Sequence, residues 1–179
     1  PFAFGHLVIQ YAEEGRYYKL LTKNSILIGN GIDSDYYTPS VELLKPNITE
    51  QYEIVVIANL APWHGIDLLL NALKKFKPNF KLHIIGDGVE KNNLLNITKH
   101  LKLTEQVVFY GKLNRTEYLP IIQNAHLGVG SLNWKLIGVT ISSALKLREY
   151  VSSGLQVIYS SRDVDLDGED YCYQVQPNC

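Results

Sequence analysis

Residues 53–88 read EIVVIANLAPWHGIDLLLNALKKFKPNFKLHIIGDG, and this stretch decides the expected fold. The residues that follow Glu53, up to Ala58, are apolar and mostly β-branched, which predicts a buried strand. Residues 64–77 then place apolar side chains at helical spacing. Residues 81–85 (KLHII) predict a second strand, which ends at a glycine-containing turn at residues 86–88. The stretch therefore predicts one strand–helix–strand unit.

The same alternation continues toward the C-terminus. Further helices are expected at 90–101, 116–125 and 143–153, and further strands at 106–110, 126–130, 155–159 and 171–175. Strands that alternate with helices of this length form right-handed crossovers and a parallel sheet. Their apolar character is typical of sheets covered on both faces. The predicted fold class is therefore α/β, a Rossmann-like doubly wound parallel sheet from about residue 52 onward.

The N-terminal residues do not follow this alternation. Residues 25–28 (SILI) predict a short strand, followed by a tight turn at Asn30-Gly31. Residues 37–47 contain two prolines and predict a connector. We assign residues 1–45 to the remnant of an N-terminal domain and the interdomain linker, and residues 46–179 to the Rossmann-like domain.

Composition limits the classes of function. Of the 179 residues, 46% are hydrophobic and 20% are charged, as in ordinary globular domains, and the net charge of −1 gives no reason to expect a nucleic-acid partner. No window of 18 apolar residues predicts a membrane span. The sequence contains no methionine, so we interpret the chain as a fragment or a processed product. Asp163, Asp165 and Asp167 alternate as in a calcium loop, but the remaining spacing fails, and we interpret them as a solvated acidic loop.

The helix expected at 143–153 carries the most informative charges. Lys146 falls in its first turn, where a cation opposes the helix dipole. An anion bound at the helix N-terminus would resolve that conflict. Glu149 lies on the same helical stripe and could accept hydrogen bonds from sugar hydroxyls. A surface Lys–Glu pair worth a few tenths of a kcal/mol is an equally valid reading of these residues alone.

Several motifs in this order resemble those of the retaining GT-B glycosyltransferases often called family 4 or group 1. They are Asn30–Asp33, Ala58–Asp67, Leu82–Gly88, Val108–Gly111 and Lys146–Gly154. The resemblance implies a C-terminal domain that binds a nucleotide-diphosphate sugar, with a saccharide or lipid-linked acceptor bound by a separate N-terminal domain. It also implies a cytoplasmic enzyme of polysaccharide or cell-envelope biosynthesis, which needs no metal or further cofactor. Peripheral membrane association of the full enzyme, and inactivity of this chain alone, are further expectations.

The resemblance also implies roles for individual residues. Lys146 and His64 would act on the diphosphate as catalytic residues, and Glu149 would bind the ribose. Further donor contacts are expected from the first loop, from the start of the last helix and from the turn after the third strand. These contacts are Gly65, Ser143, the backbone N–H groups of Ala144 and Leu145, and Lys112 with Leu113 near the base.

The sequence departs from the family pattern at three positions. Asn59 and His64 stand where the family commonly has an Arg and a Lys, and Ile141 stands where a Glu is expected eight residues before Glu149. Two other interpretations therefore stay open. The chain could be a nucleotide-sugar-binding module without catalysis, or part of another GT-B enzyme such as a nucleotide-sugar epimerase.

Overall fold

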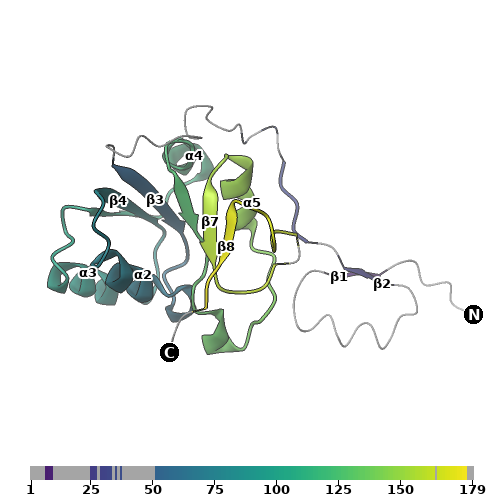
Figure 1. The fold of residues 1–179 in the computed structure, drawn as a ribbon, viewed down its shortest axis with the longest axis horizontal. Coiled ribbons are helices and arrows are strands. Elements are labelled where there is room, and N and C mark those ends of the chain that lie inside the picture. Colours follow the sequence, from purple (N-terminus) through teal and green to yellow (C-terminus); the bar gives the residue numbers. More distant parts are fainter. Residues whose placement is uncertain are drawn as a thin grey trace, which may run out of the picture.

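The structure is a computed structural model that describes residues 7–9, 25–27, 29–33, 35, 37, 51–163 and 165–176 (Figure 1). The predicted domain boundary at residues 45 and 46 lies outside these residues. Within the N-terminal part, β1 (Leu7–Ile9) and β2 (Ser25–Leu27) form a two-stranded parallel sheet of their own. The second of these strands agrees with the strand predicted at 25–28, up to Leu27.

The main sheet has six strands in the order β5-β4-β3-β6-β7-β8, and every neighbouring pair is parallel. The predicted Rossmann-like parallel sheet is therefore confirmed. The strands are β3 (Tyr52–Ile57), β4 (Phe80–Ile85), β5 (Val107–Gly111), β6 (Leu127–Val129), β7 (Gln156–Tyr159) and β8 (Cys172–Gln174).

Four α-helices connect these strands: α2 (Ile66–Leu73), α3 (Lys91–His100), α4 (Arg115–Gln123) and α5 (Leu145–Ser152). Two short 3-10 helices, η3 (Pro62–His64) and η4 (Trp134–Ile137), lie in the loops after β3 and β6. The prediction was wrong about where two helices begin, because α2 begins two residues later than expected and so does α5.

The strand order reverses between β3 and β6. The chain runs outward from β3 through β4 to β5 and then returns to place β6 on the other side of β3. Because all crossovers share one hand, α2 and α3 cover one face of the sheet, and α4 and α5 cover the other (Figure 1). Each face has its own apolar core: Ile54 and Val56 belong to the first, and Val55 to the second. In such sheets the ligand crevice opens at the carboxyl ends of the strands flanking the reversal.

Tyr150 of α5 fixes this helix against the reversal point. Its side chain is fully buried, and its hydroxyl oxygen accepts a hydrogen bond of 2.7 Å from the backbone N–H of Ile57 in β3. The ring lies directly on Gly128 of β6, where a Cβ atom would come within 2.3 Å of it. The missing side chain of Gly128 therefore allows α5 to approach the sheet closely.

We predict that Tyr150→Phe destabilises the domain by about 1–3 kcal/mol, because the buried N–H of Ile57 loses its acceptor while the ring stays in place. Chemical denaturation followed by circular dichroism measures the change. Tyr173→Phe is the matched control, since Tyr173 is 46% exposed, and should stay within about 0.5 kcal/mol of the parent. Equal stability of both variants would contradict the role given to the Tyr150 hydroxyl.

Candidate functional site

The candidate site lies where the loops after β3 and β6 meet. Backbone hydrogen bonds join them, from Leu132 N–H to the His64 carbonyl at 3.0 Å and from Asn133 N–H to the Trp63 carbonyl at 3.1 Å. Gly65 has φ of 62°, and a Cβ atom there would lie 3.0 Å from the Leu132 Cβ. The visible role of Gly65 is thus to let the two loops close together, and its contact with a donor stays a prediction.

His64 is buried between these two loops. Its Nδ1 atom lies 2.7 Å from Ser131 Oγ, and its Nε2 atom lies 3.3 Å from Asn59 Oδ1. The rings of Trp63 and Trp134 flank it, with centroids at 5.9 and 6.2 Å. Burial, and to a smaller extent the charge of Lys146, lower the pKa of His64 to about 3, so the imidazole is neutral at pH 7.

Lys146 occupies the second position of α5 and points toward His64. Its ammonium nitrogen lies 3.4 Å from His64 Nδ1, and burial lowers the pKa of Lys146 to about 7. None of the ion pairs found among the described residues involves Lys146. The charged form of this side chain is therefore not balanced by an acidic group of the described chain, and an anionic ligand would stabilise it.

The start of α5 differs from the prediction, and the reason lies in contacts distant in sequence. The Ser143 hydroxyl accepts a hydrogen bond of 2.6 Å from the Asn30 backbone N–H, and the Ser143 carbonyl accepts one from the Asn30 side chain. The Ser142 hydroxyl pairs with Ser161 at 2.6 Å. Both serines are thereby held outside the helix. Ala144 becomes the N-cap, and no side chain caps the helix there.

This arrangement affects the three predicted phosphate contacts at the start of α5 in different ways. The Ser143 hydroxyl already has a protein partner in Asn30, which leaves it less suited to a ligand. Ala144 and Leu145 lie at the uncapped opening of α5, next to Lys146. Free N–H groups at a helix N-terminus are a favourable environment for an anion. The uncapped start of α5 and the Lys146 ammonium therefore favour a bound anion at the same position.

Glu149 lies one turn further along α5 and is half-buried. Its Oε1 atom accepts hydrogen bonds from the hydroxyls of Tyr37, at 2.7 Å, and Tyr118, at 3.2 Å. Burial and the bond to Glu149 raise the pKa of Tyr37, which keeps this hydroxyl protonated and donating. Oε2 has no hydrogen bond among the described residues, so one oxygen of the carboxylate is left for a ligand. Sequence analysis did not predict a role for either tyrosine.

Arg148 faces the opposite way and has a structural role. It pairs with both oxygens of Asp163, with Asp165 Oδ2 at 2.7 Å, and through Nε with the Asn30 carbonyl at 3.2 Å. Asp163 is fully buried. The interpretation of Asp163, Asp165 and Asp167 as a solvated loop was therefore wrong at Asp163, because pairing with Arg148 compensates its burial.

We predict that Arg148→Ala destabilises the domain by about 3–5 kcal/mol, since it leaves the Asp163 carboxylate buried without its partner. Arg162→Ala is the matched control, because its side chain is 63% exposed, and it should cost less than about 1 kcal/mol. Urea unfolding of the three proteins tests this. A cost for Arg148→Ala no larger than that of the control would contradict the structural role.

Lys112 and Leu113 lie apart from His64 along the carboxyl edge of the sheet, because they follow β5, which β4 separates from β3, the strand before His64. Lys112 is exposed, whereas Leu113 packs against the core beneath α4 and α5. Asn114 then caps α4, the helix whose Tyr118 reaches Glu149. The predicted contact of Lys112 and Leu113 with a base stays a prediction.

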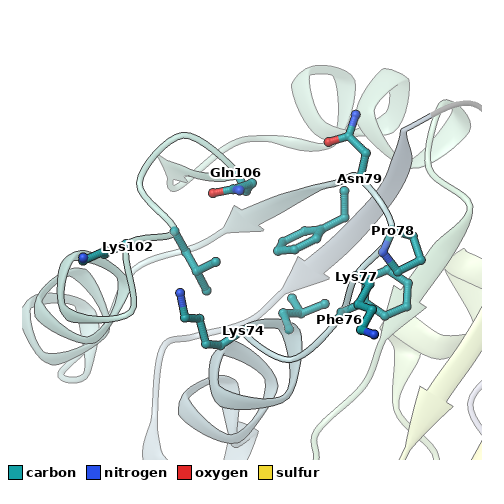
Figure 2. A pocket seen from close by; sticks show the side chains of 10 residues that line it. Lys74, Phe76, Lys77, Pro78, Asn79, Lys102 and Gln106 are labelled. Atoms are coloured by element: carbon teal, nitrogen blue, oxygen red, sulfur yellow. The ribbon is translucent and has the colours of Figure 1, made fainter.

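A hollow of about 360 Å³ lies away from the candidate site, at the amino ends of the strands (Figure 2). The end of α2, the start of β4 at Phe80 and the segment 102–106 line it, with Lys74, Lys77 and Lys102 among its residues. Ligands of parallel α/β sheets bind at the carboxyl ends of the strands, which here form the opposite edge. We therefore place the candidate site at the loops after β3 and β6 rather than in this hollow.

The described part of the chain contains no group of three or more His, Cys, Asp or Glu side chains arranged to hold a metal ion. Within the same residues, no helix is both long enough and apolar enough to cross a membrane.

The six-stranded parallel sheet, with its reversal point and a helical layer on each face, is a Rossmann-like domain of the kind that forms the C-terminal half of GT-B glycosyltransferases. The chain belongs to the family described as "Glycosyl transferases group 1", whose family model matches residues 44–161, more than half of the chain. The predicted family is therefore confirmed.

Curated relatives agree with this family. The O-antigen biosynthesis glycosyltransferase WclY of Escherichia coli is 33% identical over 122 residues, which cover 64% of this chain and 33% of the relative. An uncharacterized glycosyltransferase of Haemophilus influenzae is 31% identical over 103 residues, which cover 56% of this chain and 28% of the relative. The chain thus spans about a third of the length of the curated relatives it matches.

Solved structures share the fold. Sucrose-phosphate synthase from Thermosynechococcus elongatus superposes with a TM-score of 0.74 at 17% identity, covering 97% of this chain and 46% of that protein. The Anabaena protein HepE, solved in complex with UDP-glucose, gives a TM-score of 0.71 at 17% identity, covering 98% of this chain and 51% of that protein.

Proposed function

We propose that the domain binds a nucleotide-diphosphate sugar, with the diphosphate at the opening of α5 and against Lys146. The observation that carries this proposal is the Lys146 ammonium, which lies beside an uncapped helix N-terminus at the reversal point and has no acidic partner in the described chain. The UDP-glucose complex of HepE, a protein of the same fold, supports the choice of ligand class.

The proposed reaction of the whole protein is transfer of the sugar, of hexose type, to a saccharide or lipid-linked acceptor. Breaking the bond between the anomeric carbon and the diphosphate leaves negative charge on the nucleoside diphosphate. Lys146 and the N–H groups at the start of α5 would stabilise this charge without a metal. Because the aligned region covers only about a third of the matched relatives, we expect these residues alone to bind the donor without transferring it.

Glu149 is proposed to hold the ribose. Its free Oε2 atom would accept hydrogen bonds from the ribose hydroxyls, while Tyr37 and Tyr118 keep the carboxylate in place. Lys112 and Leu113 are proposed to contact the base. A role in polysaccharide synthesis is proposed from the name of the relative WclY, which describes O-antigen biosynthesis.

A binding module without catalysis is the second candidate. The structure adds one observation in its favour, since His64 is neutral and Asn59 uncharged where the family pattern commonly has cations. Fewer positive charges would then face the leaving diphosphate. Donor binding without turnover in the whole protein would identify this second candidate.

We predict different ligand profiles for two substitutions. Lys146→Ala should lower the affinity for a nucleoside diphosphate by about 10- to 150-fold, since charge-assisted hydrogen bonds contribute about 1.5–3 kcal/mol each. The affinity for the free nucleoside should fall by much less. Glu149→Ala should weaken both ligands by about 10- to 100-fold, because both carry the ribose. Isothermal titration calorimetry measures these affinities. Lys74→Ala, in the hollow at the amino ends of the strands, is the control, and this variant should bind both ligands with the affinity of the parent.

The pH dependence of ligand affinity distinguishes an effect of the Lys146 charge from an effect of its size. A bound diphosphate raises the pKa of Lys146 above its free value of about 7, so binding takes up a proton above pH 7. Affinity for a nucleotide sugar should fall between pH 7 and 8.5, by up to about tenfold per pH unit, and level off below pH 7. Lys146→Ala should abolish this slope. The assignment of Lys146 to the diphosphate would be refuted if Lys146→Ala lost affinity equally for the nucleoside and the nucleoside diphosphate and still showed the pH dependence.

A further inference from the structure

The contacts of His64 determine which of its nitrogens carries the proton. An ammonium has only hydrogens to offer, so His64 Nδ1, 3.4 Å from Lys146 Nζ, acts as an acceptor toward charged Lys146. On the other side of the ring, Nε2 faces Asn59 Oδ1 at 3.3 Å, which is an acceptor and requires a proton on Nε2. Both contacts select the same neutral tautomer, and its single Nδ1 lone pair, which also lies 2.7 Å from Ser131 Oγ, is shared between the Ser131 hydroxyl and the Lys146 ammonium.

We propose that His64 and Ser131 are positioning residues, which hold the Lys146 ammonium at the meeting point of the β3 and β6 loops. His64 then contributes an acceptor to the lysine rather than a charge to the ligand. That the positioned ammonium binds the diphosphate of the donor rests on the function proposed above.

The surroundings of His64 give it the rigidity that this role needs. Its backbone carbonyl accepts a hydrogen bond from the Leu132 N–H, and Gly65 follows in the left-handed conformation. Ser131 is buried and contacts the Nδ1 edge of the ring. A lysine side chain has many rotamers, and ordering it on binding reduces affinity. A fixed acceptor that orders the ammonium in advance therefore improves binding without contacting the ligand.

The charges around His64 are few among the residues that the structure describes. Lys146 approaches it from α5, and the other described side chains that contact the ring are uncharged, namely Asn59, Ser131, Trp63 and Trp134. Among the described residues, Lys146 is also the single charge that shifts the pKa of His64. Any change of pH dependence in this site near neutrality is thus attributable to Lys146.

A double-mutant cycle with a nucleoside diphosphate tests the proposal. His64→Phe keeps the aromatic packing and removes the acceptor, so it should lower affinity by about 5- to 30-fold, but by less than about twofold in a Lys146→Ala background. His64→Asn, whose amide oxygen can replace Nδ1, should retain most of the affinity. Ser131→Ala, which only loosens the ring, should cost about two- to fivefold. Equal losses from His64→Phe in both backgrounds would overturn the proposal, since His64 would then act on the ligand directly or through packing.

A measurement without ligand separates this proposal from the proposed function. The Lys146 side-chain pKa is followed by NMR in the free protein. Loss of the acceptor in His64→Phe should lower this pKa relative to the parent, while His64→Asn should leave it nearly unchanged. If His64→Phe does not fold, His64→Leu, which also removes the acceptor, should lower the Lys146 pKa in the same way. An unchanged or raised pKa overturns the positioning role. Failure of the parent to bind any nucleoside diphosphate, with the predicted pKa shift present, refutes the proposed function alone.

Discussion

The reversal of strand order between β3 and β6 is the constraint on which the rest of the structure depends. It sends the crossover helices to opposite faces and leaves the loops after β3 and β6 side by side at one edge. Hydrogen bonds of His64 and Trp63 with Leu132 and Asn133 join these loops. A lysine and a histidine that are 82 positions apart in sequence thereby come within 3.4 Å.

Helix α5 is held at this reversal point by side chains that are nearly consecutive in sequence. Tyr150 anchors it to β3 and β6, and Arg148 anchors it to Asp163 and to the Asn30 backbone. These two contacts are on the buried sides of the helix. Lys146 and Glu149 are thus left half-buried toward the carboxyl edge of the sheet. Within the segment Lys146–Tyr150, some side chains therefore hold the helix in place and others are available to a ligand.

Local pattern was enough to predict most of the fold. Strand and helix periodicity found all six strands of the main sheet and its four helices, because burial against a sheet imposes that periodicity on neighbouring residues. Sequence analysis also placed Lys146 in the first turn of α5 and Glu149 on the same helical stripe as Lys146. What failed depended on contacts between distant residues. The start of α5 was misplaced because Ser143 binds Asn30, 113 positions away, and Asp163 was taken as solvated because its partner Arg148 lies on another element. Ser131 and Tyr37 were missed for the same reason, since nothing near them in sequence marks His64 or Glu149 as their partners.

The central claim is that the donor binds at the loops after β3 and β6 rather than at the basic hollow on the opposite edge. Backbone hydrogen exchange, measured by mass spectrometry with and without a saturating nucleoside diphosphate, tests it directly because both locations are read in one experiment. We expect slower exchange in residues 58–65, 130–135 and 144–149, and unchanged exchange in residues 74–80 and 102–106. Protection confined to residues 74–80 and 102–106 would contradict the account.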